Sequence, residues 1–274
     1  MNATRPLAGL AALTAVALGL TGCGSSSSDS PSGTAAAAPS ASATPAPAEE
    51  LLASIPDEKV AAYVFASSGA CYALTGVLDA PGKAISTKIS EDIPEVGGSL
   101  TMSFLAFGAE KPYAKFAIKP AAVAEQLGVG KSWYAADPAE LTDFADSPLS
   151  YNDETDPLGA GVLIGTATDV ARSGDGVFTG TADLSEIAAA HPVLKEEEVE
   201  QLGDKAKSVP FEATVDAKSG HLAELAVKIP SAGKVKGGTC TIAYTGYDAT
   251  KALTEPAAGD VKKATANVYD LLNS

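Results

Sequence analysis

The sequence offers few side chains that could do covalent chemistry, because it has only three cysteines and two histidines among 274 residues. His191 precedes a proline at the end of a predicted helix and His221 follows a glycine turn, so we expect both on the surface. The acidic residues Asp153, Glu154 and Asp156 lack the ligand spacing of a calcium loop, which favours a solvated loop. No glycine-rich loop typical of phosphate binding is present.

Three short segments are similar to motifs of penicillin-binding serine enzymes, but they occur in the wrong order. They are "SAGK" (231–234), "YND" (151–153) and "KSG" (218–220). In those enzymes the serine motif comes first and begins a helix, whereas here it comes last, in a predicted turn. We therefore expect a protein that is not an enzyme and that uses no cofactor and no metal.

Cys23 ends a stretch that has the features of a signal peptide. Arg5 gives a basic start, and the uncharged run Leu7–Leu20 is shorter than the roughly 20 apolar residues of a membrane-spanning helix. The following "LTGC" resembles the lipobox of bacterial lipoproteins, in which the chain is cut before the cysteine and its thiol carries a diacylglyceryl group. This resemblance implies removal of residues 1–22 and lipidation of Cys23. The alternative is an uncleaved signal anchor with an incidental cysteine.

The segment after Cys23 is polar and lacks hydrophobic residues that could form a core. From Gly24 to Pro47 it consists of Ser, Ala, Pro, Gly and Thr, with Asp29 as its only charge. Such a composition predicts a disordered tether, here residues 23–48. The remaining residues, 49–274, then form a single domain, held at the extracytoplasmic face of the cell membrane.

The charge balance excludes some partners. The chain has 34 acidic and 19 basic residues, and such a surface repels phosphate backbones and anionic headgroups. We therefore expect no nucleic-acid binding, and contact with the cytoplasmic membrane through the acyl chains of Cys23 alone.

The two other cysteines, Cys71 and Cys240, both lie in strand-like sequence, "GACYALTG" and "GGTCTIAYTG". Export to an oxidising compartment and an even remaining pair predict a Cys71–Cys240 disulfide. The alternative is two buried free thiols. A CxxC pattern, which redox catalysis would need, is absent.

Alternating apolar residues predict an α+β domain that is dominated by antiparallel strands. Residues 99–107 and 113–118 form one predicted hairpin, and 211–215 with 222–230 form another, in which Ala223 and Leu225 share a face. Residues 239–245 form a further strand, with Cys240, Ile242 and Tyr244 on one side, and "SGDG" (173–176) is a turn.

Helices are fewer. An aspartate followed by a proline predicts helix starts at Asp137 and Asp156, giving helices over 138–146 and 157–167. Shorter helices are predicted over 185–190 and over 195–203, the latter ending at Gly203. Residues 259–272 carry one apolar stripe, so we expect this helix to pack against the domain.

The continuous apolar faces of the strands must be buried somewhere. Helices could seal them in a dry core, or the sheet could curve and leave a cavity for a lipid tail, and periodicity does not separate these alternatives. The residues that would line such a cavity are Leu100, Met102, Phe104, Phe116, Ile118, Trp133, Leu163, Leu225, Val227, Ile229, Ile242 and Tyr244.

Several segments together resemble the LppX/LprA/LprF/LprG lipoproteins, which share a half-barrel fold with the LolA and LolB carriers. The segments are "KPYAKF" (111–116), "KSWYAAD" (131–137), "DPLGAGVLIGTATDVARSGDGVFTGTADLS" (156–185) and "PFEATVDAKSGHLAELAVKI" (210–229). The resemblance implies a curved antiparallel sheet, partly closed by helices, with a hydrophobic cavity that binds acylated lipids or glycolipids.

The sequence thus favours a membrane-anchored lipoprotein that carries or displays lipid in the cell envelope. In this interpretation the helices around residues 121–146 and 157–168 gate the cavity. The alternative is a non-enzymatic envelope lipoprotein with a dry core, whose acidic outer face binds another protein.

Overall fold

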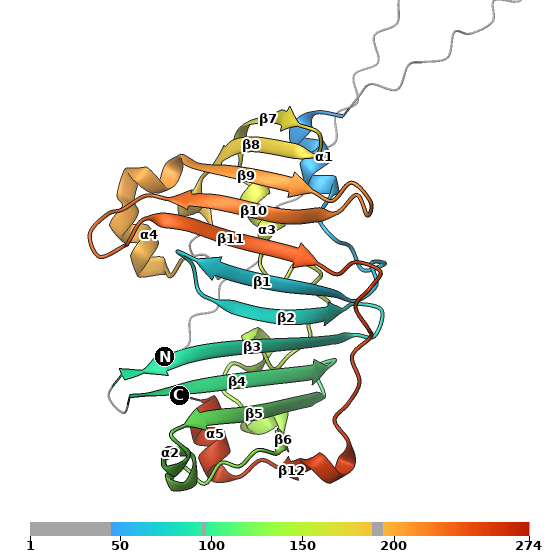
Figure 1. Ribbon diagram of the computed structural model, residues 1–274, viewed down its shortest axis with the longest axis vertical. Helices are drawn as coiled ribbons and strands as arrows, with labels where there is room; N and C mark the ends of the chain where they lie inside the picture. The colour runs from blue at the N-terminus through green and yellow to red at the C-terminus, as the bar shows by residue number, and fades with distance from the viewer. Residues whose placement is uncertain (1–44, 95–96, 188–193, 274) are drawn as a thin grey trace, which may run out of the picture. The chain divides into compact units, whose positions relative to one another are not determined.

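A single twelve-stranded sheet dominates the part of the chain that the structure describes (Figure 1). The computed structural model describes residues 45–94, 97–187 and 194–273, which belong to one compact unit that starts at residue 44. The strands are β1 (Tyr63–Gly69), β2 (Leu74–Asp79), β3 (Ala84–Ile93), β4 (Gly98–Phe107), β5 (Lys111–Lys119), β6 (Trp133–Ala135), β7 (Thr168–Gly174), β8 (Val177–Ala182), β9 (Val209–Val215), β10 (Leu222–Ile229), β11 (Gly238–Thr245) and β12 (Val261–Lys263).

Two antiparallel meanders make up most of the sheet. Strands β1 to β5 form one and β7 to β11 the other, and they join where β1 pairs with β11, with Phe65 opposite Tyr244. The short strands β6 and β12 extend the first meander and pair with each other in parallel. The α+β class and both predicted hairpins are therefore confirmed, as is the turn at 173–176 between β7 and β8.

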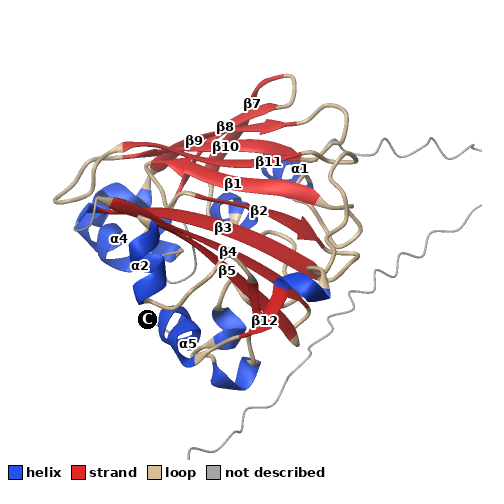
Figure 2. Cartoon of the chain, turned by 60° about the horizontal axis from the view of Figure 1, so that its bottom comes forward, coloured by secondary structure: helices blue, strands red, loops and turns tan. Residues whose placement is uncertain are grey.

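The helices are short and lie mostly on one side of the sheet. They are α1 (Pro47–Ala53), α2 (Ala121–Gln126), α3 (Ala160–Gly165), α4 (Glu196–Leu202) and α5 (Ala266–Leu272), with 3-10 turns η2 (Pro138–Glu140), η3 (Phe144–Asp146), η4 (Leu184–Glu186), η5 (Gly203–Lys207) and η6 (Ala258–Asp260). Figure 1 places α3 and α5 behind the strands, and Figure 2 shows the sheet curving over the helices. The helix α1 begins at Pro47, inside the predicted tether.

The predicted helix over 138–146 is wrong. Asp137 does cap a helical turn, since its Oδ1 accepts a hydrogen bond from Ala139 N at 3.0 Å. The turn stops after η2, because Leu141 has an extended backbone (φ −100°, ψ 133°). Asp143, just before η3, is left-handed (φ 47°) and interrupts the helix a second time. The N–H of Thr142, between the two turns, donates to Asn273 Oδ1 on the C-terminal segment at 2.8 Å.

The other helix predictions are right in part. The helix over 195–203 is confirmed as α4, which ends at Gly203. The helix over 157–167 is shortened to α3, because Gly159 (φ 63°) delays its start. The helix over 259–272 is wrong in its first half, where β12 pairs with β6 instead, but α5 packs on the domain with Val268 fully buried. Of the predicted segment 185–190, residues 188–190 lie outside the described residues and η4 precedes them.

The inner face of the sheet holds two clusters of packed side chains. The larger cluster lies between α1, α3, α4 and strands β1, β2 and β8 to β11. The smaller lies between α5 and strands β3 to β6. One predicted detail is wrong, because a β-bulge between Leu222 and Glu224 shifts the register and buries Leu222 completely in place of Ala223.

The two cysteines meet where β1 leaves the sheet beside β11. Gly69 pairs with Cys240, and a Cβ at position 69 would lie 2.1 Å from the carbonyl oxygen of Thr239, so only glycine allows this close approach. Cys71 follows two residues later, and its Sγ lies 2.11 Å from Cys240 Sγ, the distance of a disulfide bond. The pair therefore has the geometry that the sequence predicts, and it ties the end of β1 to β11.

Candidate functional site

A groove follows the inner face of β3, where the two packed clusters meet. Alternate residues of a strand share a face, so Ile85, Thr87, Ile89 and Glu91 point to the same side. Ile85 and Thr87 line one cavity, and Ile89 and Glu91 line a second. Leu74 of β2, which is opposite Ile89, packs against both clusters.

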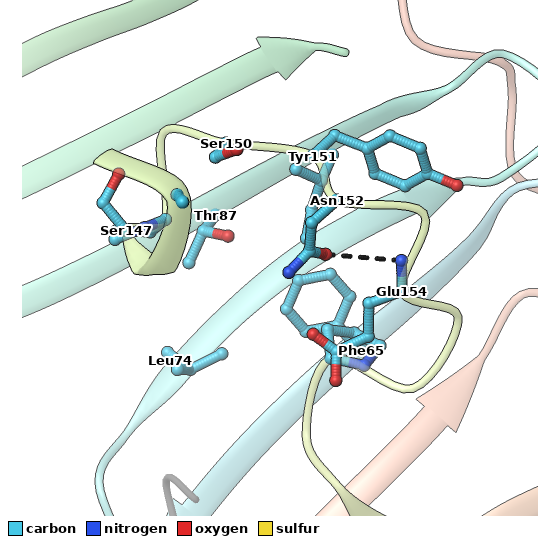
Figure 3. Close-up of a pocket in the computed structure, with 12 residues that line it drawn as sticks. Phe65, Leu74, Thr87, Ser147, Ser150, Tyr151, Asn152 and Glu154 are labelled. Carbon is cyan, nitrogen blue, oxygen red and sulfur yellow. Dashed lines mark hydrogen bonds between the residues drawn. The ribbon is translucent and has the colours of Figure 1, made fainter. Parts of the chain in front are cut away.

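The first cavity has a volume of about 570 Å³ and a mixed lining (Figure 3). We call it the polar cavity. Phe65, Leu74, Ile85 and Thr87 come from the sheet, whereas the other lining residues belong to the segment 145–157. These other residues are Ala145, Ser147, Pro148, Ser150, Tyr151, Asn152, Glu154 and Pro157.

The second cavity has a volume of about 360 Å³ and is lined mostly by hydrophobic side chains. We call it the apolar cavity. Ile89, Leu100, Met102, Phe104 and Phe116 form its sheet side. The opposite side and the ends are formed by Glu91, Ser147, Pro148, Leu149, Leu271 and Leu272.

The two cavities are neighbours, because Ser147 and Pro148 line both. The segment 145–157, which lies mostly between the two predicted helices over 138–146 and 157–167, covers the groove. It is fixed in its middle by the buried side chain of Leu149 and by Tyr151 N, which donates to Gly108 O on the β4–β5 turn at 3.3 Å.

The far end of this segment is held by tyrosines from the sheet. The Tyr63 hydroxyl donates to Thr155 O at 2.5 Å, and the Tyr244 hydroxyl donates to Asp156 Oδ1. The same carboxylate caps α3, since it accepts from Ala160 N at 3.1 Å and Gly161 N at 2.7 Å. Burial raises the pKa of Tyr244 well above its ordinary value, and the Asp156 charge adds to this, so the phenol remains a donor.

Only acidic side chains bring charge to the lining of these two cavities. Glu154 lines the polar cavity, where burial first and the Asp156 carboxylate second raise the pKa of its carboxyl group. Glu91 lines the apolar cavity and accepts a hydrogen bond from the Tyr72 hydroxyl at 2.6 Å. Burial, followed by this hydrogen bond, raises the pKa of Tyr72 to about 12. The lining of both cavities contains no lysine and no arginine.

The structure brings four of the predicted lining residues together in the apolar cavity, namely Leu100, Met102, Phe104 and Phe116. Ile118 is buried in the same cluster but does not line the cavity. The prediction that Trp133 lines the cavity is wrong. Its neighbour Tyr134 pairs with Ala114 and is buried inside, so Trp133 faces the other side of the sheet, where Lys115 Nζ lies 5.7 Å from the ring centroid.

The remaining six predicted lining residues belong to the larger packed cluster and line neither of these two cavities. Each has at most 3% of its surface exposed, because α1, α3 and α4 fill the space beneath the strands. They are Leu163, Leu225, Val227, Ile229, Ile242 and Tyr244. For these residues the dry-core alternative, and not the cavity, describes the structure.

Sequence reasoning missed the residues that close the groove. Ile85, Thr87 and Ile89 alternate in "AISTKISEDI", but the polar residues between and after them obscured the pattern. Leu149 stands alone in the polar stretch "SPLSYND", and no local signal marks it as buried.

The residues considered for chemistry are placed as follows. His221 is half-buried and not on the surface as predicted, with its Nδ1 atom buried and its ring 5.2 Å from the ring of Tyr247. Cys23 and His191 lie outside the described residues. Within the described ranges, no group of three or more His, Cys, Asp or Glu side chains is arranged to hold a metal ion.

No protein-family model matches the sequence, and no curated protein matches it either. Across residues 45–94, 97–187 and 194–273, no helix has the length and hydrophobicity needed to span a membrane.

Proposed function

We propose that this chain is an exported lipoprotein, anchored to the membrane through Cys23, that holds an acylated lipid in the groove along β3 and carries or displays it in the cell envelope. The observation that carries the proposal is the apolar cavity of about 360 Å³, which four of the predicted lining residues share. Its volume lies within the range of small-molecule sites. No bond is made or broken in this role.

The apolar cavity has the size of one acyl chain. Taking about 30 Å³ for each small group, the share of a water molecule in the liquid, it holds roughly a dozen methylene groups. Burying these at about 0.8 kcal/mol each gives about 10 kcal/mol before association is counted. Association itself opposes binding by about 4 to 15 kcal/mol, so we expect reversible binding, which suits a carrier.

The curved sheet supports the proposed relation to the LppX/LprA/LprF/LprG lipoproteins and to LolA-like half-barrels. We propose that the segment 145–157, held at Leu149 and Asp156, is the part that moves when lipid enters. The groove is closed by this segment and α5, and not by helices over 121–146 and 157–168.

Lipid uptake tests the proposal. A soluble form that begins at Gly24 retains the whole compact unit. It is incubated with a bacterial membrane lipid extract, separated by gel filtration and analysed for bound lipid. The matched variants are Met102→Trp, which fills the apolar cavity, and Ser103→Trp, which places the same side chain on the outer face one residue later.

We expect near-stoichiometric lipid with the wild type and Ser103→Trp, and a loss of most of it with Met102→Trp. A folded wild type that takes up no lipid contradicts the proposal and favours the alternative, an envelope protein with a dry core that binds another protein.

A further inference from the structure

Thr87 is a buried residue of β3 whose hydroxyl opens on the polar cavity and has no hydrogen-bond partner among the described residues. Only 7% of the residue is exposed, and its Oγ1 forms no hydrogen bond with any of the described residues. Figure 3 shows the side chain projecting from β3 toward the segment that carries Ser147 and Asn152. A hydroxyl that faces a cavity and makes no hydrogen bond within the protein is free to bond a ligand or water there.

Thr87 lies on β3 at the boundary between the polar and the apolar cavity. It lines the polar cavity, and the next inward residues of β3, Ile89 and Glu91, line the apolar one. Its strand neighbours are Gly76, which has no side chain, and Phe104, which lines the apolar cavity. A chain in the apolar cavity that leaves toward the polar cavity therefore passes Thr87.

The charge of the lining restricts the polar end of a ligand. Glu91 and Glu154 are acidic, and no lysine or arginine lines either cavity to pair with a phosphate or carboxylate. An anionic end would lie unpaired beside these carboxylates, which is unfavourable in a partly desolvated site. Ser150 and Asn152 provide neutral hydrogen-bonding groups instead.

We infer that the ligand is a single-chain acyl ester with an uncharged polar end, whose ester carbonyl accepts a hydrogen bond from Thr87. This inference rests on the proposed function. The acyl chain runs from Thr87 toward Glu91, a distance of about 13 Å for four residues of a strand. The polar end lies in the polar cavity beside Ser150 and Asn152.

Two glycerol lipids that differ only at the linkage test the role of Thr87. Monolauroylglycerol has an ester carbonyl, whereas 1-O-dodecylglycerol has the same headgroup and an ether linkage. Binding of each to the soluble form from Gly24 is measured by isothermal titration below the concentration at which the lipids aggregate. The variants are Thr87→Val, which has the same shape without the hydroxyl, and Thr87→Ser, which retains it.

We expect Thr87→Val to bind the ester about 3- to 10-fold more weakly, the effect of one hydrogen bond, and to bind the ether within about 2-fold of the wild type. Thr87→Ser should restore ester binding. Thermal unfolding of the empty protein is an independent readout. Thr87→Val should unfold at the same or a higher temperature than the wild type, because no hydrogen bond between described residues is lost.

The failures are distinguishable. Equal losses for ester and ether, or a lower unfolding temperature of empty Thr87→Val, overturn the role of Thr87 while lipid binding stands. Lauroyl lysophosphatidate, the anionic probe with the same chain, should bind at least about tenfold more weakly than monolauroylglycerol. Equal or tighter binding of this anion overturns the uncharged class. If neither glycerol lipid binds the wild type and the membrane extract gives none either, the proposed function itself fails.

Discussion

Replacing Asp156 by alanine should loosen the segment that covers the groove, and the structure indicates by how much. The carboxylate accepts hydrogen bonds from two backbone N–H groups at the start of α3 and from the hydroxyl of Tyr244. Tyr244 is only 1% exposed, so removal of Asp156 takes away the partner of a hydroxyl that is buried in the protein. The substitution therefore removes a helix cap and leaves the buried Tyr244 hydroxyl without an acceptor.

The two losses can be estimated separately. Loss of the cap lowers the free energy of unfolding by about 1 kcal/mol. A buried donor without an acceptor lowers it by about 1 to 3 kcal/mol more. We expect Asp156→Ala to lower the free energy of unfolding by about 3 kcal/mol in total. Tyr244→Phe removes the donor together with its need for a partner and should cost about 1 kcal/mol. The double variant should then be more stable than the sum of the single effects implies, by about 1 to 2 kcal/mol.

Urea unfolding of the wild type, both single variants and the double variant measures this coupling, followed by circular dichroism at one pH and salt concentration. Additive effects of the two substitutions within about 0.3 kcal/mol would refute the reasoning, because they would mean that Asp156 and Tyr244 do not depend on each other. The slope of the unfolding transition serves as the control, since a changed slope would indicate a different folded or unfolded state.

Three further predictions concern the disulfide, a carboxyl group and an aromatic residue. Replacing Cys71 and Cys240 by alanine should lower the free energy of unfolding by about 2 to 5 kcal/mol, because the pair closes a loop of 169 residues. If the variant and the oxidised wild type unfold at the same urea concentration, the disulfide bond is contradicted. Burial, and then Asp156, raise the pKa of Glu154, so folding favours its neutral form. The wild type should therefore lose stability relative to Glu154→Gln as the pH rises from about 4.3 through the folded-state pKa, and the difference should not change with pH below that range. A difference that stays constant at every pH would exclude this shift. Trp133→Leu should leave lipid uptake unchanged and lower the free energy of unfolding by less than about 1 kcal/mol, the size of an exposed cation–π contact. Tyr134→Ala, at the buried neighbour, should lower it by about 3 kcal/mol. Reduced lipid uptake by Trp133→Leu would mean that Trp133 lines the cavity after all.

The strands could be predicted well because their information is local. The alternation of Leu100, Met102, Phe104 and Ala106 fixes which side of β4 is buried, whatever packs against it. β12 could not be predicted in this way. Its three residues pair with β6, more than 120 positions earlier in the chain, and such a pairing leaves no periodic signal.

The site could be predicted only in part, for a physical reason. Inner-face position follows from alternation, but whether an inner residue meets a helix or a cavity depends on what lies beneath it. Val227 is fully buried in the cluster beneath β8 to β11, whereas Met102 lines open space under the segment 145–157. The predicted helix is interrupted just before this segment, at the extended Leu141 and the left-handed Asp143, and neither residue type signals such a break in the sequence.

Native mass spectrometry with lipid extraction tests the central claim most directly, using the soluble form from Gly24 expressed in a host with a cell envelope and purified without detergent. We predict a folded protein that carries one acylated species per chain, and an empty protein when Met102 is replaced by tryptophan. A wild type that emerges empty and stays empty when acylated lipids are offered would contradict the account.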